Sequence, residues 1–304
     1  MRIKVKKKDI KRNLTWYTFI IIPIITLAVL TYKPLMTSIY YSFTNMKTYG
    51  MDYEIVGWEN YKNLMSNSMF LGALKNTILL AVYGLLTIPL GFLLANAING
   101  LGRTKLQGFF RVTFYMPNII TGVSVVLVFQ YVLKRNGGLL NEFLSLLTGQ
   151  DVAIGWLSDY RYSHIGATIL HIWMSLGYAM LINLANLQSI PTEIYEAAAI
   201  DGASPLKKMR YITIPQMKFC FAFLLITSMI GGLSRFTDLY ILSGNTPAGK
   251  PNGTLMTMLM YIYQYSFETP RYGISSAGAM VLFVIVMAFT ILNLKMSGFL
   301  KESD

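Results

Sequence analysis

The segment EIYEAAAIDGASPLKKMRYITIP, which runs from Glu193 to Pro215, lies between two long apolar segments and differs in composition from both. Its first part, EIYEAAAI, is rich in glutamate and alanine, which have high helix propensity. Pro191 and Thr192 precede it and are suited to the start of a helix. We therefore expect a short helix from about Glu193 to Ile200.

A glycine and two prolines divide the rest of this segment. Gly202 supplies a turn, and Ser204 followed by Pro205 fits the cap and first position of a second helix. Pro215 is expected to end that helix. The predicted helix, glycine turn and helix form either an amphipathic loop on lipid headgroups or a contact surface for a partner protein. Charged residues for such a contact are Glu196, Asp201, Lys207, Lys208 and Arg210.

The composition of the whole chain indicates a membrane protein. The 304 residues are 54% hydrophobic and only 13% charged, whereas a soluble domain carries about 25% charged residues. Apolar segments of about 20 residues, the length that spans a bilayer, recur along the chain. We predict an all-α polytopic membrane protein with six spans, at about 15–40, 73–97, 112–133, 165–187, 218–242 and 274–294.

The distribution of basic residues predicts the orientation of these spans. The net charge is +12, but seven of the 26 basic residues lie in the first twelve positions, directly before the first apolar run, which argues against nucleic-acid binding. No small-residue cleavage site follows that run, so we expect an uncleaved first span. With both termini in the cytoplasm, cytoplasmic segments hold sixteen basic residues and external segments hold seven. The predicted location is the cell membrane, with both termini inside.

The spans also suggest a division of the chain. We expect a basic cytoplasmic N-terminus at 1–14, a first transmembrane helix with its external loop at 15–72, and a transmembrane core at 73–296. That core contains the cytoplasmic loop 191–217, and a cytoplasmic tail follows at 297–304. The single cysteine, Cys220, excludes an internal disulfide, and the two histidines, His164 and His171, lack a third ligand, so no metal site is predicted.

The loop also carries a recognisable motif. Glu196-Ala197-Ala198, Gly202, Ile212 and Pro215 resemble the EAA motif of ABC importer permeases, which reads E-A-A, three residues, G, nine residues, I-x-L-P. The chain keeps every fixed position of this pattern except that Ile214 replaces the leucine. The stretches GWENYKNLMSNSMFLGALKNT and YGISSAGAMVLFVIVMAFTILNLKM extend the resemblance over nearly the whole chain, to the carbohydrate-uptake, maltose-type branch of binding-protein-dependent permeases. One departure is SGNTPAGKP, where many relatives have Gly-Gly-Pro after the fifth span.

The resemblance implies a type I ABC importer permease fold. Such a subunit pairs with a second homologous permease subunit, and the pair sits on two ATPase subunits. An extracellular solute-binding protein delivers the sugar, and the EAA loop couples the permease to an ATPase. The resemblance places this coupling at Glu196, Ala197, Ala198, Asp201, Gly202, Ile212 and Pro215.

The sequence lacks the residues for nucleotide chemistry. No G-x-x-x-x-G-K-[ST] motif is present, so we expect no enzymatic activity and no cofactor in this chain. ATP and magnesium would be used by the separate ATPase subunit.

Polar residues within the spans are the candidates for a substrate path. Arg235 and Asp238 are three residues apart, so a continuous helix would place them on one face, able to pair. The resemblance places sugar contacts on the fourth and fifth spans. Gly231 and Gly232 would either leave room for a ligand or allow close helix packing. The candidates are Leu176, Gly177, Met180, Ser228, Gly231, Gly232, Arg235 and Asp238.

The sequence predicts the permease subunit of an ATP-driven importer for a sugar or oligosaccharide. The same machinery could carry a non-sugar solute of the glycerol-phosphate or polyamine type. An ion-coupled secondary transporter is the alternative from another class, but the halves show no inverted repeat and the spans lack suitable carboxylates. Membrane lipid is an expected partner, and nucleic acid is not.

Overall fold

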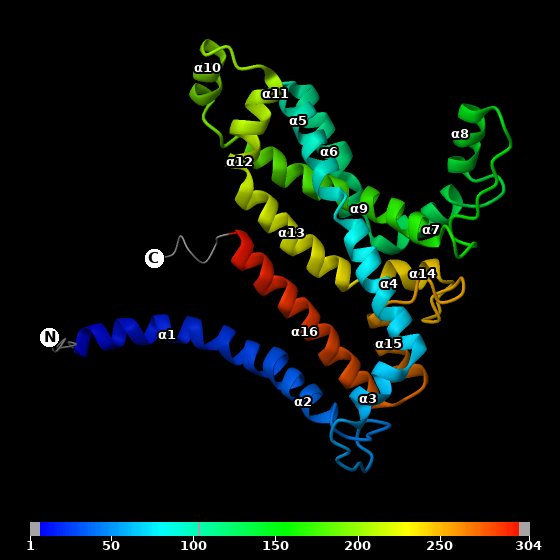
Figure 1. Cartoon of the computed structure of the whole chain (residues 1–304). Helices are drawn as coiled ribbons and strands as arrows, with labels where there is room; N and C mark the ends of the chain where they lie inside the picture. The colour runs from blue at the N-terminus through cyan, green and yellow to red at the C-terminus, as the bar shows by residue number, and fades with distance from the viewer. Residues whose placement is uncertain (1–6, 103, 298–304) are drawn as a thin grey trace.

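The computed structural model describes residues 7–102 and 104–297, which form helices joined by loops (Figure 1). Within these residues, four helical segments are long and apolar enough to cross a membrane, and two bent helix pairs bring the number to six if each pair is one span. The prediction of an all-α chain with several membrane spans is confirmed. The four long segments are Trp16–Tyr41, Ser68–Asn99, Ser163–Leu187 and Tyr272–Ser297.

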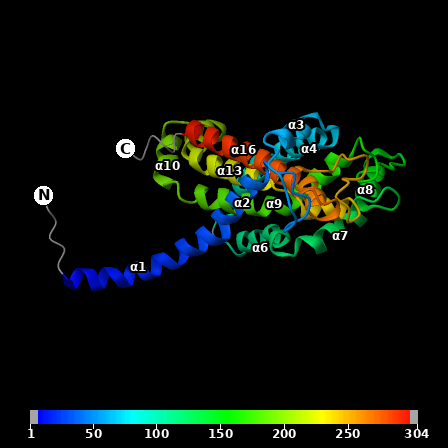
Figure 2. The same cartoon turned by 90° about the horizontal axis from the view of Figure 1, so that it is seen from below.

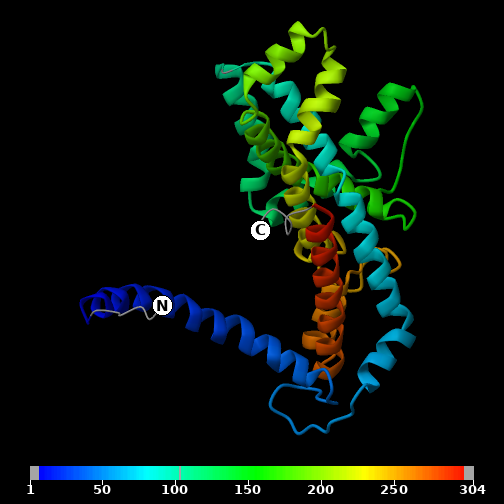
Figure 3. The ribbon, with the colours of Figure 1, turned by 60° about the vertical axis from the view of Figure 1, so that its left-hand side comes forward.

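The first span extends away from the other helices. It consists of α1 (Lys7–Leu27), a π-helical turn (Ala28–Tyr32) and α2 (Lys33–Tyr41). Figures 1 and 3 show α1 leaving the bundle, while α2 lies against the start of α16 (Tyr272–Ser297). Every residue from 16 to 34 is exposed, although this stretch is strongly apolar. Of the predicted terminal segments, residues 1–6 and 298–304 lie outside the described residues, whereas residues 7–14 belong to α1.

Each π-helical turn in the described part of the chain ends two residues before a proline. The turns Ala28–Tyr32, Met209–Thr213 and Gln264–Glu268 are followed by Pro34, Pro215 and Pro270. Proline has no N–H, and its ring crowds the carbonyl four residues earlier. The wider turn relieves this crowding, because the residue before each proline donates instead to the carbonyl five residues back.

The core is built on the long central helices. α4 (Ser68–Gly84) continues into α5 (Thr87–Asn99), α5 packs on α9 (Ser163–Leu187), and α13 (Lys218–Leu233) packs on α4 and α16. Small residues allow this close approach: a Cβ added to Gly91 of α5 would lie 2.7 Å from the Cβ of Ala179. Two apolar clusters result, one around Phe70, Leu170 and Tyr261 and one around Phe92, Met180 and Leu224.

The predicted third span, 112–133, is bent. α6 (Lys105–Ile119) and α7 (Gly122–Val132) meet at an angle of 99°. Ile120 has extended backbone angles, and Thr121 has a ψ of 129°. Pro117 and the β-branched run Ile119-Ile120-Thr121 weaken the helix here. The predicted span is therefore present as two helices joined by a sharp bend.

The predicted fifth span, 218–242, is also interrupted. α13 ends at Leu233, and α14 (Thr237–Leu242) begins after a break at Ser234–Phe236. The adjacent Gly231 and Gly232 have low helix propensity and precede this break. Arg235 and Asp238 consequently do not lie on one continuous helix, which corrects the helix-face argument made from their spacing.

The remaining helices lie in the loops. α3 (Glu59–Ser66), α8 (Leu139–Thr148) and α15 (Met258–Tyr263) lie toward one side of the molecule, whereas α10 (Thr192–Ile200), the start of α1 and the end of α16 lie toward the other (Figures 1 and 2). Asn141 anchors the α7–α9 connection. Its Nδ2 donates to the carbonyls of Arg135 and Ile154, and its Oδ1 accepts from Trp156 Nε1 at 2.8 Å.

Candidate functional site

The segment 191–217 forms the predicted helix, glycine turn and helix. α10 ends with two hydrogen bonds that close the turn: Gly202 N donates to Ala199 O at 3.0 Å, and Ala203 N donates to Ala198 O at 2.9 Å. This pattern is a Schellman motif, which needs a residue with positive φ after the helix. Gly202 has a φ of +73° and meets this need without a Cβ penalty.

The second helix begins as predicted, at Pro205, with Ser204 as its cap. Ser204 Oγ accepts from Lys207 N, and α11 (Pro205–Lys208) continues through the π turn into α12 (Ile214–Gln216). Pro215 was predicted to end this helix, but it lies inside α12, because the π turn accommodates the proline. The chain instead bends by 64° after Gln216, where α13 begins at Lys218.

Side chains on the inner face of this loop fix it to the bundle. Tyr195 Oη and Thr213 Oγ1 are 2.9 Å apart and join α10 to the π turn. Tyr195 and Met209 also pack on the apolar cluster that contains Met180 and Met217. The hydrogen bond thus joins the two helical parts of the loop, and the apolar contacts fix the loop to the bundle.

The tip of the loop exposes large apolar side chains on either side of the glycine turn. Ile200 is 88% exposed, Leu206 76% and Tyr211 70%. Exposed apolar groups rimmed by charge mark interaction surfaces. Glu196 and Asp201 are exposed beside them, as are Ala197 and Pro215, whereas Ala198 and Ile212 are half-buried. We call Ile200, Leu206 and Tyr211 the apolar tip. The sequence analysis missed it, although two of its members lie within four residues of Gly202.

The three predicted substrate-path residues on α9 differ in how deeply they are buried. A Cβ on Gly177 would lie against the carbonyl of Phe114 and 2.7 Å from Tyr115 Cα, so Gly177 is a close-packing position between α9 and α6. Met180 is fully buried in an apolar cluster. Leu176 is only half-buried.

On α13 the two adjacent glycines differ. A Cβ on Gly232 would lie 2.9 Å from Ala81 Cα, so Gly232 allows α13 to approach α4. Gly231 is exposed, and a Cβ added there would meet nothing within 4 Å. Ser228 is half-buried, one helical turn before Gly231 on the same helix. Leu176, Ser228 and Gly231 are therefore the candidates on these two helices that are not packed inside the chain.

Arg235 and Asp238 form an ion pair across the break between α13 and α14. Arg235 is 6% exposed, and its Nε donates to Asp238 Oδ2 at 3.0 Å. Its Nη2 donates to the same carboxylate and to the Ala167 carbonyl of α9 at 3.1 Å. Thr257 Oγ1 donates to the Arg235 carbonyl at 3.0 Å, and Thr257 caps α15. The pair thus connects four helices.

A second polar network lies near this pair. Asn76 of α4 donates to the carbonyls of Gly253 and Met256, and its Oδ1 lies 3.1 Å from His164 Nε2. His164 is therefore engaged with α4. Among the described residues, no group of three His, Cys, Asp or Glu side chains is placed to hold a metal ion.

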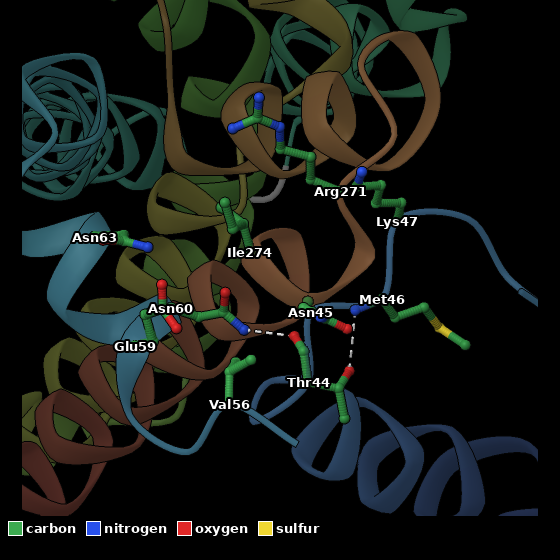
Figure 4. Close-up of a pocket in the computed structure, with 11 residues that line it drawn as sticks. Thr44, Asn45, Met46, Lys47, Val56, Glu59, Asn60, Asn63, Arg271 and Ile274 are labelled. Carbon is green, nitrogen blue, oxygen red and sulfur yellow. Dashed lines mark hydrogen bonds between the residues drawn. The ribbon is translucent and has the colours of Figure 1, made fainter. Parts of the chain in front are cut away.

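A polar pocket lies where the loop after α2 meets α3 and α16 (Figure 4). Its volume is about 230 Å³. Asn60 Nδ2 donates to the carbonyls of Ser42 and Thr44 at 2.9 and 2.8 Å, which fixes α3 to this loop. Lys47 and Arg271 line the pocket. Cationic groups therefore lie on the side of the molecule opposite α10.

Comparisons with known proteins identify transport permeases that are similar to this chain in sequence. The permease protein MsmF of the multiple sugar-binding transport system of Streptococcus mutans is 30% identical, and the match covers 94% of this chain and 96% of MsmF. The arabinooligosaccharides transport system permease protein AraP of Bacillus subtilis is 27% identical, over 95% of this chain and 86% of AraP.

Solved structures agree with these relatives. A chain of a bacterial ABC transporter that imports the acidic polysaccharide alginate matches with a TM-score of 0.81 and 25% identity, over 95% of this chain and 97% of that chain. A chain of the alginate transporter in complex with its alginate-bound periplasmic protein matches with a TM-score of 0.79 and 26% identity, over 95% and 96%. The model of the family described as binding-protein-dependent transport system inner membrane component matches residues 87–297. The chain belongs to this family.

Proposed function

We propose that the chain is a permease subunit of an ATP-driven importer and that it translocates a sugar or oligosaccharide. The loop 191–217 carries this proposal, because it presents a rigid turn with an apolar tip between two membrane spans. Support for the substrate class comes from the relatives, which include permeases named for multiple sugars, galactooligosaccharides and arabinooligosaccharides.

A separate ATPase subunit is proposed to bind the apolar tip. The sequence contains no phosphate-binding loop, so ATP and magnesium would be used by that subunit. Ile200 and Leu206 would be buried by the ATPase, while Glu196 and Asp201 would make charged contacts at the rim. The fixed Gly202 turn would transmit ATPase movement to α13, which begins directly after the loop.

The exposed first span supports a second permease subunit as a partner. Residues 16–34 are all exposed among the residues that the structure describes, which leaves a long apolar surface for a second subunit and for lipid. Two permease subunits would take two ATPase subunits. The proposed extracellular solute-binding protein would dock on the opposite side from α10. Its inclusion is supported by the alginate transporter structure that contains a periplasmic protein.

The proposed substrate path runs along α9 and α13. Leu176, Ser228 and Gly231 are the candidates with free surface, and Arg235 with Asp238 would bound the path near the broken end of α13. Gly177, Met180 and Gly232 would not contact the sugar but would hold the path-lining helices together through packing. We also propose that both termini and the loop 191–217 are cytoplasmic, as the distribution of basic residues suggests.

Uptake by the reconstituted complex tests this proposal. The permease would be purified with its co-encoded partner subunits, placed in vesicles and supplied with the binding protein and a panel of labelled sugars. ATP-dependent accumulation of one sugar is the expected result. Accumulation driven by an ion gradient without ATP would contradict the proposal, and so would selective uptake of a non-sugar solute.

A further inference from the structure

A groove between α6 and α9 lies outside the site described above. Its volume is about 340 Å³ and its lining is almost entirely apolar. Val112 and Ile119 line it and are exposed, and α6 lies at the edge of the bundle (Figure 2). The groove is therefore open to the surroundings of the helix bundle. The lining residues are Arg111, Val112, Tyr115, Met116, Ile119, Ile120 and Leu181.

One cation marks one end of this groove. Arg111 Nη2 donates to Gln188 Oε1 at 3.0 Å, and Gln188 caps α9 just before the loop 191–217 begins. Arg111 therefore lies toward the membrane face that carries the apolar tip. Its Nε is shielded from solvent and has no hydrogen-bond partner among the described residues. A buried N–H without an acceptor is costly, so this atom favours an added acceptor.

The length of the groove matches one leaflet of a bilayer. Arg111 and Ile120 are nine residues apart, which corresponds to about 13 Å along a helix. Half of the hydrocarbon core is about 15 Å thick. A chain of that length could extend from Arg111 along the apolar wall toward the bilayer midplane.

We propose that this groove binds an anionic phospholipid, with the phosphate at Arg111 and an acyl chain along Val112, Met116 and Ile119. The phosphate oxygens would accept charge-assisted hydrogen bonds from Arg111, including its unpaired Nε. Basic pockets beside transmembrane helices at the interface are suited to anionic headgroups. A helix of a second subunit would fill the apolar wall but would leave the cation without a counter-charge unless it also supplied an acid.

Lipid retention tests this proposal without measuring transport. The permease, purified with its partner subunits, would be placed in nanodiscs with equal parts of phosphatidylcholine and phosphatidylglycerol, and bound lipid would be counted by native mass spectrometry. Arg111→Gln is expected to lower retained phosphatidylglycerol about fivefold. Lys295→Gln, an exposed cation in the last turn of α16, is the matched control and should retain it.

Filling the groove gives a second test. Val112→Phe is expected to lower retained phosphatidylglycerol, whereas Val128→Phe on the exposed surface of α7 should not. Equal retention of phosphatidylglycerol by the wild type and both groove variants would overturn the proposal. A photo-crosslinker at Met116 should capture lipid. Capture of the second permease subunit would also overturn the proposal and would identify the groove as a subunit interface.

Discussion

Arg235 and Asp238 pair across a break in the fifth span, and the same guanidinium reaches the Ala167 carbonyl on α9. The break places the arginine between helices, where the Asp238 carboxylate neutralises its charge and the Ala167 carbonyl accepts a further hydrogen bond. A buried charge costs several kcal/mol when it has no partner. This pair therefore stabilises the break at the end of α13 and keeps the buried guanidinium paired with a counter-charge.

Removing one member of this pair is expected to destabilise the permease strongly. Asp238→Ala leaves Arg235 buried without its counter-charge, which typically costs about 3–5 kcal/mol. The double variant Arg235→Leu/Asp238→Leu removes both charges and should lose less stability than the single variant. Thermal unfolding of the purified protein in detergent measures both. Equal or greater loss in the double variant would contradict the account.

A partly exposed ion pair in the loop between α8 and α9 gives the control. Hydrogen bonds from Arg161 lower the pKa of Asp159 to about 2, so this carboxylate is charged at neutral pH. Its contribution is present above the ordinary aspartate pKa and is lost as the pH falls toward 2. Because the Arg161 side chain is 65% exposed and solvent screens this pair, Asp159→Ala should lower the melting temperature at pH 7 much less than Asp238→Ala does.

The adjacent glycines of α13 should respond differently to added volume. Gly232→Leu would push into the backbone of Ala81 and is expected to cost about 1–3 kcal/mol in stability. Gly231→Leu places the same side chain in open space and should preserve stability. If Gly231 faces the substrate path, this variant should lower sugar uptake at normal membrane abundance. Similar melting temperatures for the two variants would contradict the packing assignment.

The hydrogen bond between Tyr195 and Thr213 is expected to support the coupling of ATP hydrolysis to sugar uptake. Tyr195→Phe keeps the apolar contact but removes the hydroxyl, and a hydrogen bond of this kind contributes about 1 kcal/mol. We expect normal membrane abundance with reduced sugar uptake per ATP hydrolysed. Tyr131→Phe is the matched control, because Tyr131 is 75% exposed on α7, outside the loop 191–217, and its hydroxyl makes no hydrogen bond among the described residues. Unchanged coupling in Tyr195→Phe would show that the loop is held by apolar contacts alone.

Orientation is tested by cysteine accessibility. Ser204→Cys in a Cys220→Ala background should react with an impermeant reagent only after the membrane is opened. Asn252→Cys is the external control, because Asn252 is exposed in the loop between α14 and α15. Labelling of Ser204→Cys in intact cells would refute a cytoplasmic loop.

The sequence predicted the features that depend on local chemistry. Apolar run length determined the spans, and Gly202 marked the turn because a positive φ favours glycine. The break at Ile120–Thr121 was missed because apolar residues continue on both sides of it, and the break at Ser234–Phe236 was missed because Arg235 and Asp238 were interpreted as lying on one continuous helix. The sequence also could not distinguish Gly177 from Gly231. The backbone of α6 packs against Gly177, whereas Gly231 has open space beside it, and this difference depends on the tertiary structure. Exposure of Ile200 and Leu206 likewise depends on how the turn points them away from the bundle.

Association with the ATPase tests the central claim most directly. Gly202→Asp would strain the positive-φ position by about 1 kcal/mol and add a charge to the apolar tip. Glu196→Lys reverses a charge beside it, and Lys295→Gln changes a cation distant in sequence on α16 and serves as the control. The measurement is co-purification of the ATPase with each permease at equal membrane abundance. Weak ATPase association for Gly202→Asp and Glu196→Lys, with normal association for Lys295→Gln, is the predicted result. Normal ATPase association and normal sugar uptake by Gly202→Asp would show that the loop 191–217 is a lipid-surface loop and would contradict the account.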